Sequence, residues 1–117
     1  MLYETFIERW TRYNGLDYIS PMDRMKVLQD QRIEILRIAQ GHGVLNIRVF
    51  GSTASGKTSP SSDVDFLVVM RSDSSLFDQV GLVQDLHDLL GLQVHVVTEK
   101  ALHWYIRDRV MADAVEL

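Results

Sequence analysis

Two aspartates near the middle of the chain are the first candidates for chemistry. Asp63 and Asp65 lead an apolar segment, and strand side chains alternate between faces, so both carboxylates should point to the same side. Two such charges repel each other unless a cation lies between them. Gly51 and Ser52 end the preceding apolar segment, in a turn whose backbone N–H groups suit phosphate. The combination predicts a site for a nucleoside triphosphate bound with Mg²⁺.

The same loop also matches a different phosphate-binding pattern. Residues 51–58, GSTASGKT, fit the G-x-x-x-x-G-K-[ST] motif of P-loop NTPases. In that motif the lysine, here Lys57, begins a helix that faces the phosphates. Pro60 follows closely, and proline disfavours a helical conformation in the residue before it. We therefore expect a strand, not a long helix, after this loop.

Gly51-Ser52, ten further residues and then Asp63-Val64-Asp65 form a compound motif. It resembles the signature of the nucleotidyltransferase superfamily that includes DNA polymerase beta. More narrowly, the chain is similar to the minimal nucleotidyltransferases, which occur as antitoxins beside toxins of the HEPN family. The resemblance covers residues 22–117, including the RVFGS and SDVDFLVV segments and the tail from LQVHVV onward. Residues 1–20 lie outside it.

The resemblance implies a role for each residue of the motif. Gly51 and Ser52 would bind the triphosphate of ATP. Asp63 and Asp65 would act in catalysis by holding two Mg²⁺ ions ~3.5–4 Å apart, which clamp the attacking and leaving oxygens. Lys57 could neutralise phosphate, or it could be an exposed loop lysine.

One position departs from the family pattern. The family usually carries a third carboxylate on a later strand, and aligning the tail places that position at His95. A neutral imidazole can accept a proton near neutral pH, but Mg²⁺ prefers oxygen ligands. Three alternatives stay open: His95 is the base, another carboxylate such as Glu99 reaches in, or transfer activity is weakened or lost.

The resemblance also implies an activity and a partner. The domain would transfer AMP from ATP to a hydroxyl group, a tyrosine of a HEPN-family toxin, and thereby silence that toxin. One alternative is an antitoxin that neutralises its toxin by binding alone. Another is transfer to a small molecule, which usually needs a second domain to close the acceptor pocket.

Composition excludes several classes of protein. The 117 residues suit one domain, and 46% apolar with 24% charged residues is typical of a globular protein. The net charge of −4 argues against direct nucleic-acid binding, and the lack of cysteine excludes disulfides and thiolate metal sites. No apolar run reaches the ~20 residues that span a membrane, so a cytoplasmic protein is expected.

Periodicity and turn residues predict the order α, α, β, β, α, β, α. This is an α/β (α+β) domain over residues 21–117, with a small mixed sheet of three or more strands and helices packed on it, preceded by a helical extension over 1–20. The expected elements are a helix over 2–13, a helix from Ser20-Pro21 to Gly41, strands over Val44–Phe50 and Phe66–Met70, a helix from Leu76 that Gly91 stops, a strand over Leu92–Val97, and a last helix after Thr98.

Overall fold

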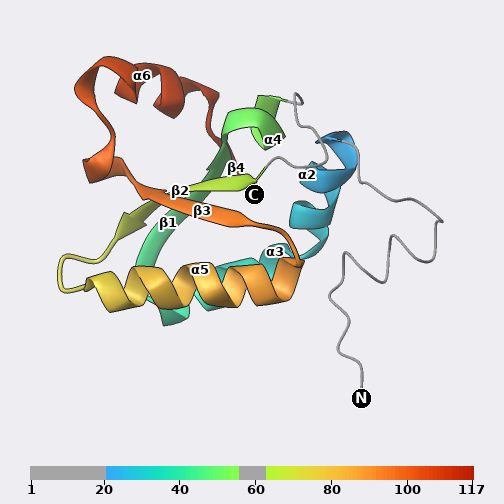
Figure 1. Cartoon of the computed structure of the whole chain (residues 1–117), viewed down its shortest axis with the longest axis horizontal. Coiled ribbons are helices and arrows are strands. Elements are labelled where there is room, and N and C mark those ends of the chain that lie inside the picture. The colour runs from blue at the N-terminus through green and yellow to red at the C-terminus, as the bar shows by residue number, and fades with distance from the viewer. Residues whose placement is uncertain (1–20, 56–62) are drawn as a thin grey trace.

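The computed structural model describes residues 21–55 and 63–117. The extension over residues 1–20, with its expected helix, lies outside the described residues. In chain order (Figure 1) the elements are α2 (Pro21–Asp30), α3 (Arg32–Gly41), β1 (Val44–Phe50), α4 (Gly51–Ser55), β2 (Val64–Met70), α5 (Leu76–Leu90), β3 (Val94–Thr98), the 3₁₀ helix η1 (Glu99–Ala101), α6 (Trp104–Asp113) and β4 (Val115–Glu116).

The strands form one mixed sheet in the order β3-β2-β1-β4. β1 runs antiparallel to β2 and β4, whereas β2 and β3 are parallel. A parallel pair needs a crossover connection, and α5 supplies it. The predicted fold class, a small mixed sheet with helices packed on it, is confirmed.

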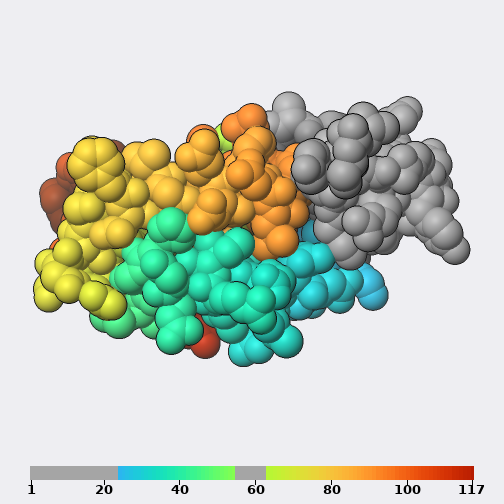
Figure 2. Space-filling model, turned by 90° about the horizontal axis from the view of Figure 1, so that it is seen from below, coloured from blue at the N-terminus to red at the C-terminus, as the bar shows by residue number. Residues whose placement is uncertain are grey.

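The hydrophobic core lies on one face of this sheet. Val64, Phe66 and Val68 alternate with Asp65 along β2 and are completely buried. Helices α3 and α5 cover this face and lie side by side, as Figures 1 and 2 show. The core cluster also includes Leu28, Ile35, Ala39, Ile47, Val49, Leu82, Leu86 and Leu90. The opposite face of β2 carries Asp65 together with the buried Leu67.

The first long helix is divided in two. The sequence predicts one helix up to Gly41, but α2 and α3 are separated at Gln31, whose φ and ψ are −96° and 12°. The break is small, because Gln31 N–H still donates to Val27 and Ile35 N–H donates to Gln31. Leu28 and Ile35 are both buried, so the two segments present the predicted apolar face to the core.

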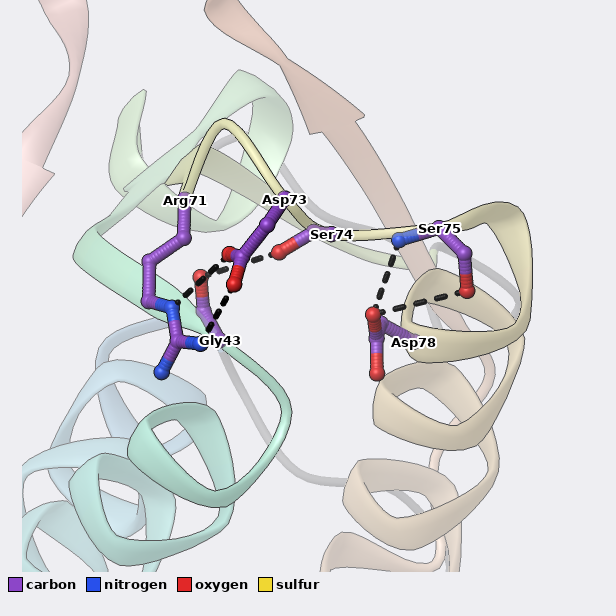
Figure 3. Close-up of polar contacts among 6 residues, drawn as sticks. All are labelled: Gly43, Arg71, Asp73, Ser74, Ser75 and Asp78. Carbon is purple, nitrogen blue, oxygen red and sulfur yellow. Dashed lines mark hydrogen bonds and ion pairs between the residues drawn. The ribbon is translucent and has the colours of Figure 1, made fainter.

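Polar contacts hold the turn between β2 and α5 (Figure 3). The Arg71 guanidinium donates to both carboxylate oxygens of Asp73, at 3.1 and 2.9 Å. The Ser75 backbone N–H donates to the Asp78 carboxylate at 2.8 Å, as in a capping box. The Arg71 backbone N–H donates to the Gly43 carbonyl at 2.7 Å and ties this turn to the end of α3. These contacts fix where the crossover helix begins.

Helix α5 begins at Leu76 as predicted, and Gly91 ends it in the left-handed conformation with φ of 68°. Its buried face differs from the predicted one at the start. Leu76 and Val80 are 71% and 57% exposed, whereas Leu82 is buried. The first turns of α5 extend beyond the core, so apolar periodicity alone placed these two residues wrongly.

The last helix differs more from the prediction. Thr98 caps η1, where its Oγ1 accepts from the Ala101 N–H at 3.2 Å, and α6 follows as a separate helix. The sequence predicts a packed helix carrying Leu102, Ile106 and Val110, yet no residue of α6 is buried. α6 contacts α4 and lies on the side of the sheet opposite α5 (Figure 1). It therefore adds little to the core.

Across residues 21–55 and 63–117, no helix combines the length and apolar character needed to cross a bilayer.

Candidate active site

A sharp turn joins β1 to the short helix α4. Gly51 adopts a φ of 72°, in the region that favours glycine. Its neighbour Phe50 pairs with Asp65 across the antiparallel ladder, which brings Gly51 beside the Asp65 carboxylate. A Cβ added to Gly51 would lie 2.5 Å from Asp65 Oδ2. The structure thus brings the glycine-serine turn and the acidic segment together.

Two strands bring Asp63, Asp65 and His95 into one cluster. Asp63 directly precedes β2, and Asp65 and His95 are register partners in the parallel pair β2–β3. His95 Nε2 lies 2.9 Å from Asp63 Oδ2, and His95 Nδ1 lies 3.4 Å from Asp65 Oδ1. One imidazole therefore faces both carboxylates.

The surroundings of Asp65 disfavour its ionised form. Burial raises the pKa of Asp65 above its ordinary value of 3.8, and the nearby charge of Asp63 raises it further. The contact with His95 works in the other direction and lowers the pKa of Asp65, though less than burial raises it. A positive charge added beside this carboxylate would stabilise its ionised form.

His95 occupies the position where the resemblance places a third carboxylate. Its side chain is 62% exposed, whereas its neighbour Val94 is buried. A histidine packed in a strand would be mostly covered, so a core-packing role does not explain His95. Its surroundings are instead the two acids of the site.

Glu99 does not stand in for the missing carboxylate. It follows Thr98, whose register partner Val68 is three residues along β2 from Asp65, or ~10 Å at strand spacing. The Glu99 carboxylate contacts the Arg48 guanidinium at 3.1 Å, and the two side chains are only 16% and 17% exposed. The sequence-based alternative that Glu99 reaches into the site is therefore wrong, and Glu99 serves as the partner of Arg48.

Replacing Glu99 with glutamine should lower stability without lowering activity. The variant leaves the mostly buried Arg48 without its charge partner, which we expect to cost ~1–3 kcal/mol in the free energy of unfolding. Glu34→Gln is the matched control, because its pair with Arg37 is 44% and 71% exposed and should matter by less than ~0.5 kcal/mol. Urea denaturation measures the stability of both variants. If the folded Glu99→Gln protein lost activity, Glu99 would belong to the site after all.

Helix α4 places two further hydroxyl residues behind the turn. Ser52 directly follows Gly51, as the motif requires. Thr53 is 2% exposed, and its Oγ1 has no hydrogen-bond partner within the described residues. No sequence pattern singles out Thr53, because threonine is ordinary in a polar loop. Lys57 lies outside the described residues, so its contact with phosphate stays a prediction.

The P-loop alternative does not fit this geometry. A P-loop helix would begin at Lys57 and run on, but β2 begins at Val64. Fewer than two helical turns of ~3.6 residues fit between those positions. The helix α4 instead begins at Gly51, before the lysine.

Asp63 and Asp65 fit the ligand chemistry of a divalent cation. Mg²⁺ is commonly held by one or two carboxylates together with substrate phosphates, and the missing Cβ of Gly51 leaves space beside Asp65 Oδ2. A cation would also offset the burial and repulsion that raise the Asp65 pKa. Within the part of the chain that the structure describes, no group of three acidic, histidine or cysteine side chains could hold a metal alone. Nucleotide phosphates would complete the ligand set.

The family model of the nucleotidyltransferase domain matches residues 31–117. The chain belongs to this family. The predicted family and enzyme class, a minimal nucleotidyltransferase, are thereby confirmed. The match contains the Gly51-Ser52 turn, both aspartates and His95.

Two archaeal relatives of this nucleotidyltransferase are named as protein adenylyltransferases. One, from Methanocaldococcus jannaschii and named so provisionally, is 36% identical over 84 residues, which cover 72% of this chain and 90% of that protein. The other is protein adenylyltransferase MntA from Thermococcus cleftensis, 38% identical over 73 residues that cover 62% and 74% of the two chains.

Solved structures agree with the architecture. A structure provisionally described as a minimal nucleotidyltransferase superposes with a TM-score of 0.73 at 35% identity, over 79% of this chain and 94% of that one. A toxin-antitoxin crystal structure with AMP-PNP superposes with a TM-score of 0.60 at 20% identity, over 70% and 68% of the chains. The second likeness is evidence for the fold alone.

Proposed function

We propose that this nucleotidyltransferase transfers AMP from Mg²⁺-bound ATP to a tyrosine hydroxyl of a HEPN-family toxin, and so acts as the antitoxin of the pair. The observation that carries the proposal is the approach of Gly51 to Asp65 beside Asp63. Support for a protein acceptor comes from relatives named protein adenylyltransferases. ATP and a toxin are proposed because the same fold occurs in a toxin-antitoxin structure that contains AMP-PNP, an ATP analogue.

The reaction is an in-line displacement at the α-phosphorus of ATP. A bond forms between the acceptor oxygen and that phosphorus, the bond from the phosphorus to the β-phosphate oxygen breaks, and pyrophosphate leaves. Mg²⁺, when bound, would stabilise charge on the attacking and leaving oxygens. Asp63 and Asp65 would hold it, while Gly51 lets the phosphates approach the backbone and Ser52 binds them.

A tyrosine acceptor suits a site without a third carboxylate. The tyrosine hydroxyl has a pKa of ~10, low enough for its proton to pass to water without a strong general base. Both ring nitrogens of His95 face Asp63 and Asp65, so we do not assign the acceptor's proton to this imidazole. General-base catalysis typically contributes ~10²–10⁴-fold, and an acidic acceptor reduces that need.

Helix α6 offers a surface on which the acceptor protein could dock. Trp104 and Tyr105 at its start are 80% and 67% exposed, and their rings contact each other. α6 contacts α4, which begins at the phosphate-binding turn (Figure 1). Exposed aromatic side chains are common anchors of protein interfaces. We assign this patch, Trp104 and Tyr105, to the toxin because it lies on the side of the sheet that carries the acids.

The variant with both Trp104→Ala and Tyr105→Ala should lose toxin binding while keeping nucleotide binding. A hot-spot aromatic contributes ~2 kcal/mol or more, so if one of the two residues is a hot spot we expect toxin affinity to fall at least ~30-fold. Phe77→Ala is the matched control, because Phe77 is 88% exposed but lies on α5, across the sheet from α6. Calorimetric titration with toxin and with AMP-PNP measures both. An unchanged toxin affinity in the double variant would place the interface elsewhere.

The alternative is an antitoxin that neutralises its toxin by binding alone, and the histidine at the position of the third carboxylate favours it. The stoichiometry of protein to toxin separates this alternative from catalysis. A transferase with ATP should silence a tenfold excess of toxin, because each molecule modifies many. A pure binder needs one molecule for each toxin, with or without ATP. The measurement is the remaining activity of the toxin after incubation. Neutralisation that needs equimolar protein and no ATP would contradict the transferase.

A further inference from the structure

A neutral His95 ring cannot satisfy both of the carboxylates that its two nitrogens face. A neutral imidazole has one N–H donor and one lone pair. Asp63 Oδ2 lies 2.9 Å from Nε2 and Asp65 Oδ1 lies 3.4 Å from Nδ1. In either tautomer of the neutral ring, one nitrogen lone pair therefore faces a carboxylate oxygen. A cation bound between those two atoms would turn the repulsion into ligation.

The distance between His95 Nε2 and Asp63 Oδ2 fits a shared ion as well as a direct hydrogen bond. Two neighbouring ligands of an octahedral ion with bonds of ~2.1 Å lie ~3.0 Å apart, and the Nε2–Oδ2 distance is 2.9 Å. The other nitrogen, Nδ1, then faces Asp65 Oδ1. Ligating histidines usually donate their second N–H to a carboxylate, which orients the ring. Asp65 would hold His95 in place and keep its own Oδ2 on the Gly51 side.

A nitrogen ligand changes which ion the site prefers. Mg²⁺ is a hard cation that takes oxygen ligands, whereas first-row transition ions accept imidazole readily. Mn²⁺ is the first-row transition ion that shares the preference of Mg²⁺ for carboxylates and water, so it is the ion to compare with Mg²⁺ at a site that adds one imidazole. The His95 ring is 62% exposed, so an arriving ion and nucleotide can reach it.

We infer that His95 is a metal ligand through Nε2 and that it makes this site select Mn²⁺ over Mg²⁺. The inference rests on the proposed function only in placing a divalent cation at Asp63. The resemblance expects a carboxylate at the position of His95. The inference gives His95 the role of a ligand that determines metal specificity, and not the role of the base.

The test measures metal binding directly. The protein, carrying ¹⁵N-labelled histidine, is titrated with Mn²⁺ and with Mg²⁺ in the presence of AMP-PNP, and pulsed electron paramagnetic resonance looks for ¹⁵N coupled to Mn²⁺. We expect directly coordinated ¹⁵N in the parent protein. In His95→Asp the coupling should vanish and the Mn²⁺/Mg²⁺ affinity ratio should fall at least ~10-fold, the usual scale for metal-site changes. His103→Asp, on the α6 side, is the matched control and should behave as the parent.

The outcomes separate this inference from the proposed function. Mn²⁺ that binds without ¹⁵N coupling, with the same affinity ratio in parent and His95→Asp, would overturn the ligand role and leave the transfer function standing. Mn²⁺ binding that survives Asp63→Ala would also overturn it, because the ion would then lie elsewhere. Failure of both ions to bind the parent protein with AMP-PNP would overturn the inference and the proposed function together.

Discussion

Replacing Asp63 or Asp65 with asparagine should abolish AMP transfer and leave a folded protein. Each variant removes a negative charge that would hold the cation, while the side chain keeps its size. Loss of one preorganised electrostatic contact costs ~10²–10³-fold in rate, and loss of a charged metal ligand should cost at least the upper value. Transfer of label from ATP to the toxin measures the effect, and Asp88→Asn on the exposed side of α5 is the control.

The same Asp65→Asn variant should be more stable than the parent at neutral pH without metal. Because the folded pKa of Asp65 is raised, its contribution to stability is fully present below 3.8 and is lost as the pH rises through the raised value. Asparagine cannot ionise, so it avoids this loss. Gains from such substitutions are ~0.5–2 kcal/mol.

Thermal unfolding at pH 4 and pH 7 checks this sign. The advantage of Asp65→Asn should be larger at pH 7 than at pH 4. If the variant is instead less stable than the parent at pH 7, the carboxylate contributes favourable contacts that outweigh its burial. If it transfers AMP at the parental rate, Asp65 does not belong to the catalytic site.

The second large effect is expected for Gly51→Ala. The new Cβ would meet Asp65 Oδ2 at 2.5 Å, and φ of 72° is strained for alanine. Backbone strain of this kind costs ~1–3 kcal/mol. The clash would also displace the carboxylate, and a shift of ~1 Å in a catalytic group costs ~10²-fold in rate. The variant should therefore lose both stability and transfer.

Gly41→Ala is the matched control for this variant. A Cβ at Gly41 has no heavy atom within 4 Å, and Gly41 ends α3, so alanine should be neutral or slightly stabilising. Urea denaturation and label transfer are measured on both proteins. Parental activity in Gly51→Ala would show that the turn does not need the close approach to Asp65.

The sequence predicts well wherever local chemistry determines the structure. The span of β1 follows from alternation between two turns, and Gly91 ends α5 because only a left-handed residue fits there. The spacing of Gly51 and Asp65 predicts one shared site, since a turn and an adjacent antiparallel strand meet by register. The position of His95 beside Asp65 follows from the family pattern.

The differences arise where tertiary packing decides. Apolar periodicity predicts that Val80 and Ile106 are covered, yet both are exposed because the core ends before them. β4 has two residues, too few for any alternation to show, and its place depends on pairing with β1. The distance of Glu99 from the site also could not be predicted from the sequence, because it depends on how far β3 runs past His95.

We propose that the Asp63–Asp65 site joins AMP, and not phosphate, to the toxin. The most direct measurement incubates protein, divalent cation and toxin with ATP labelled either at the α- or at the γ-phosphate. We expect toxin that carries the α-label alone, on a tyrosine, with none when Asp63 and Asp65 are both asparagine. Toxin that carries the γ-label, or α-labelled toxin made equally well by the double variant, would contradict it.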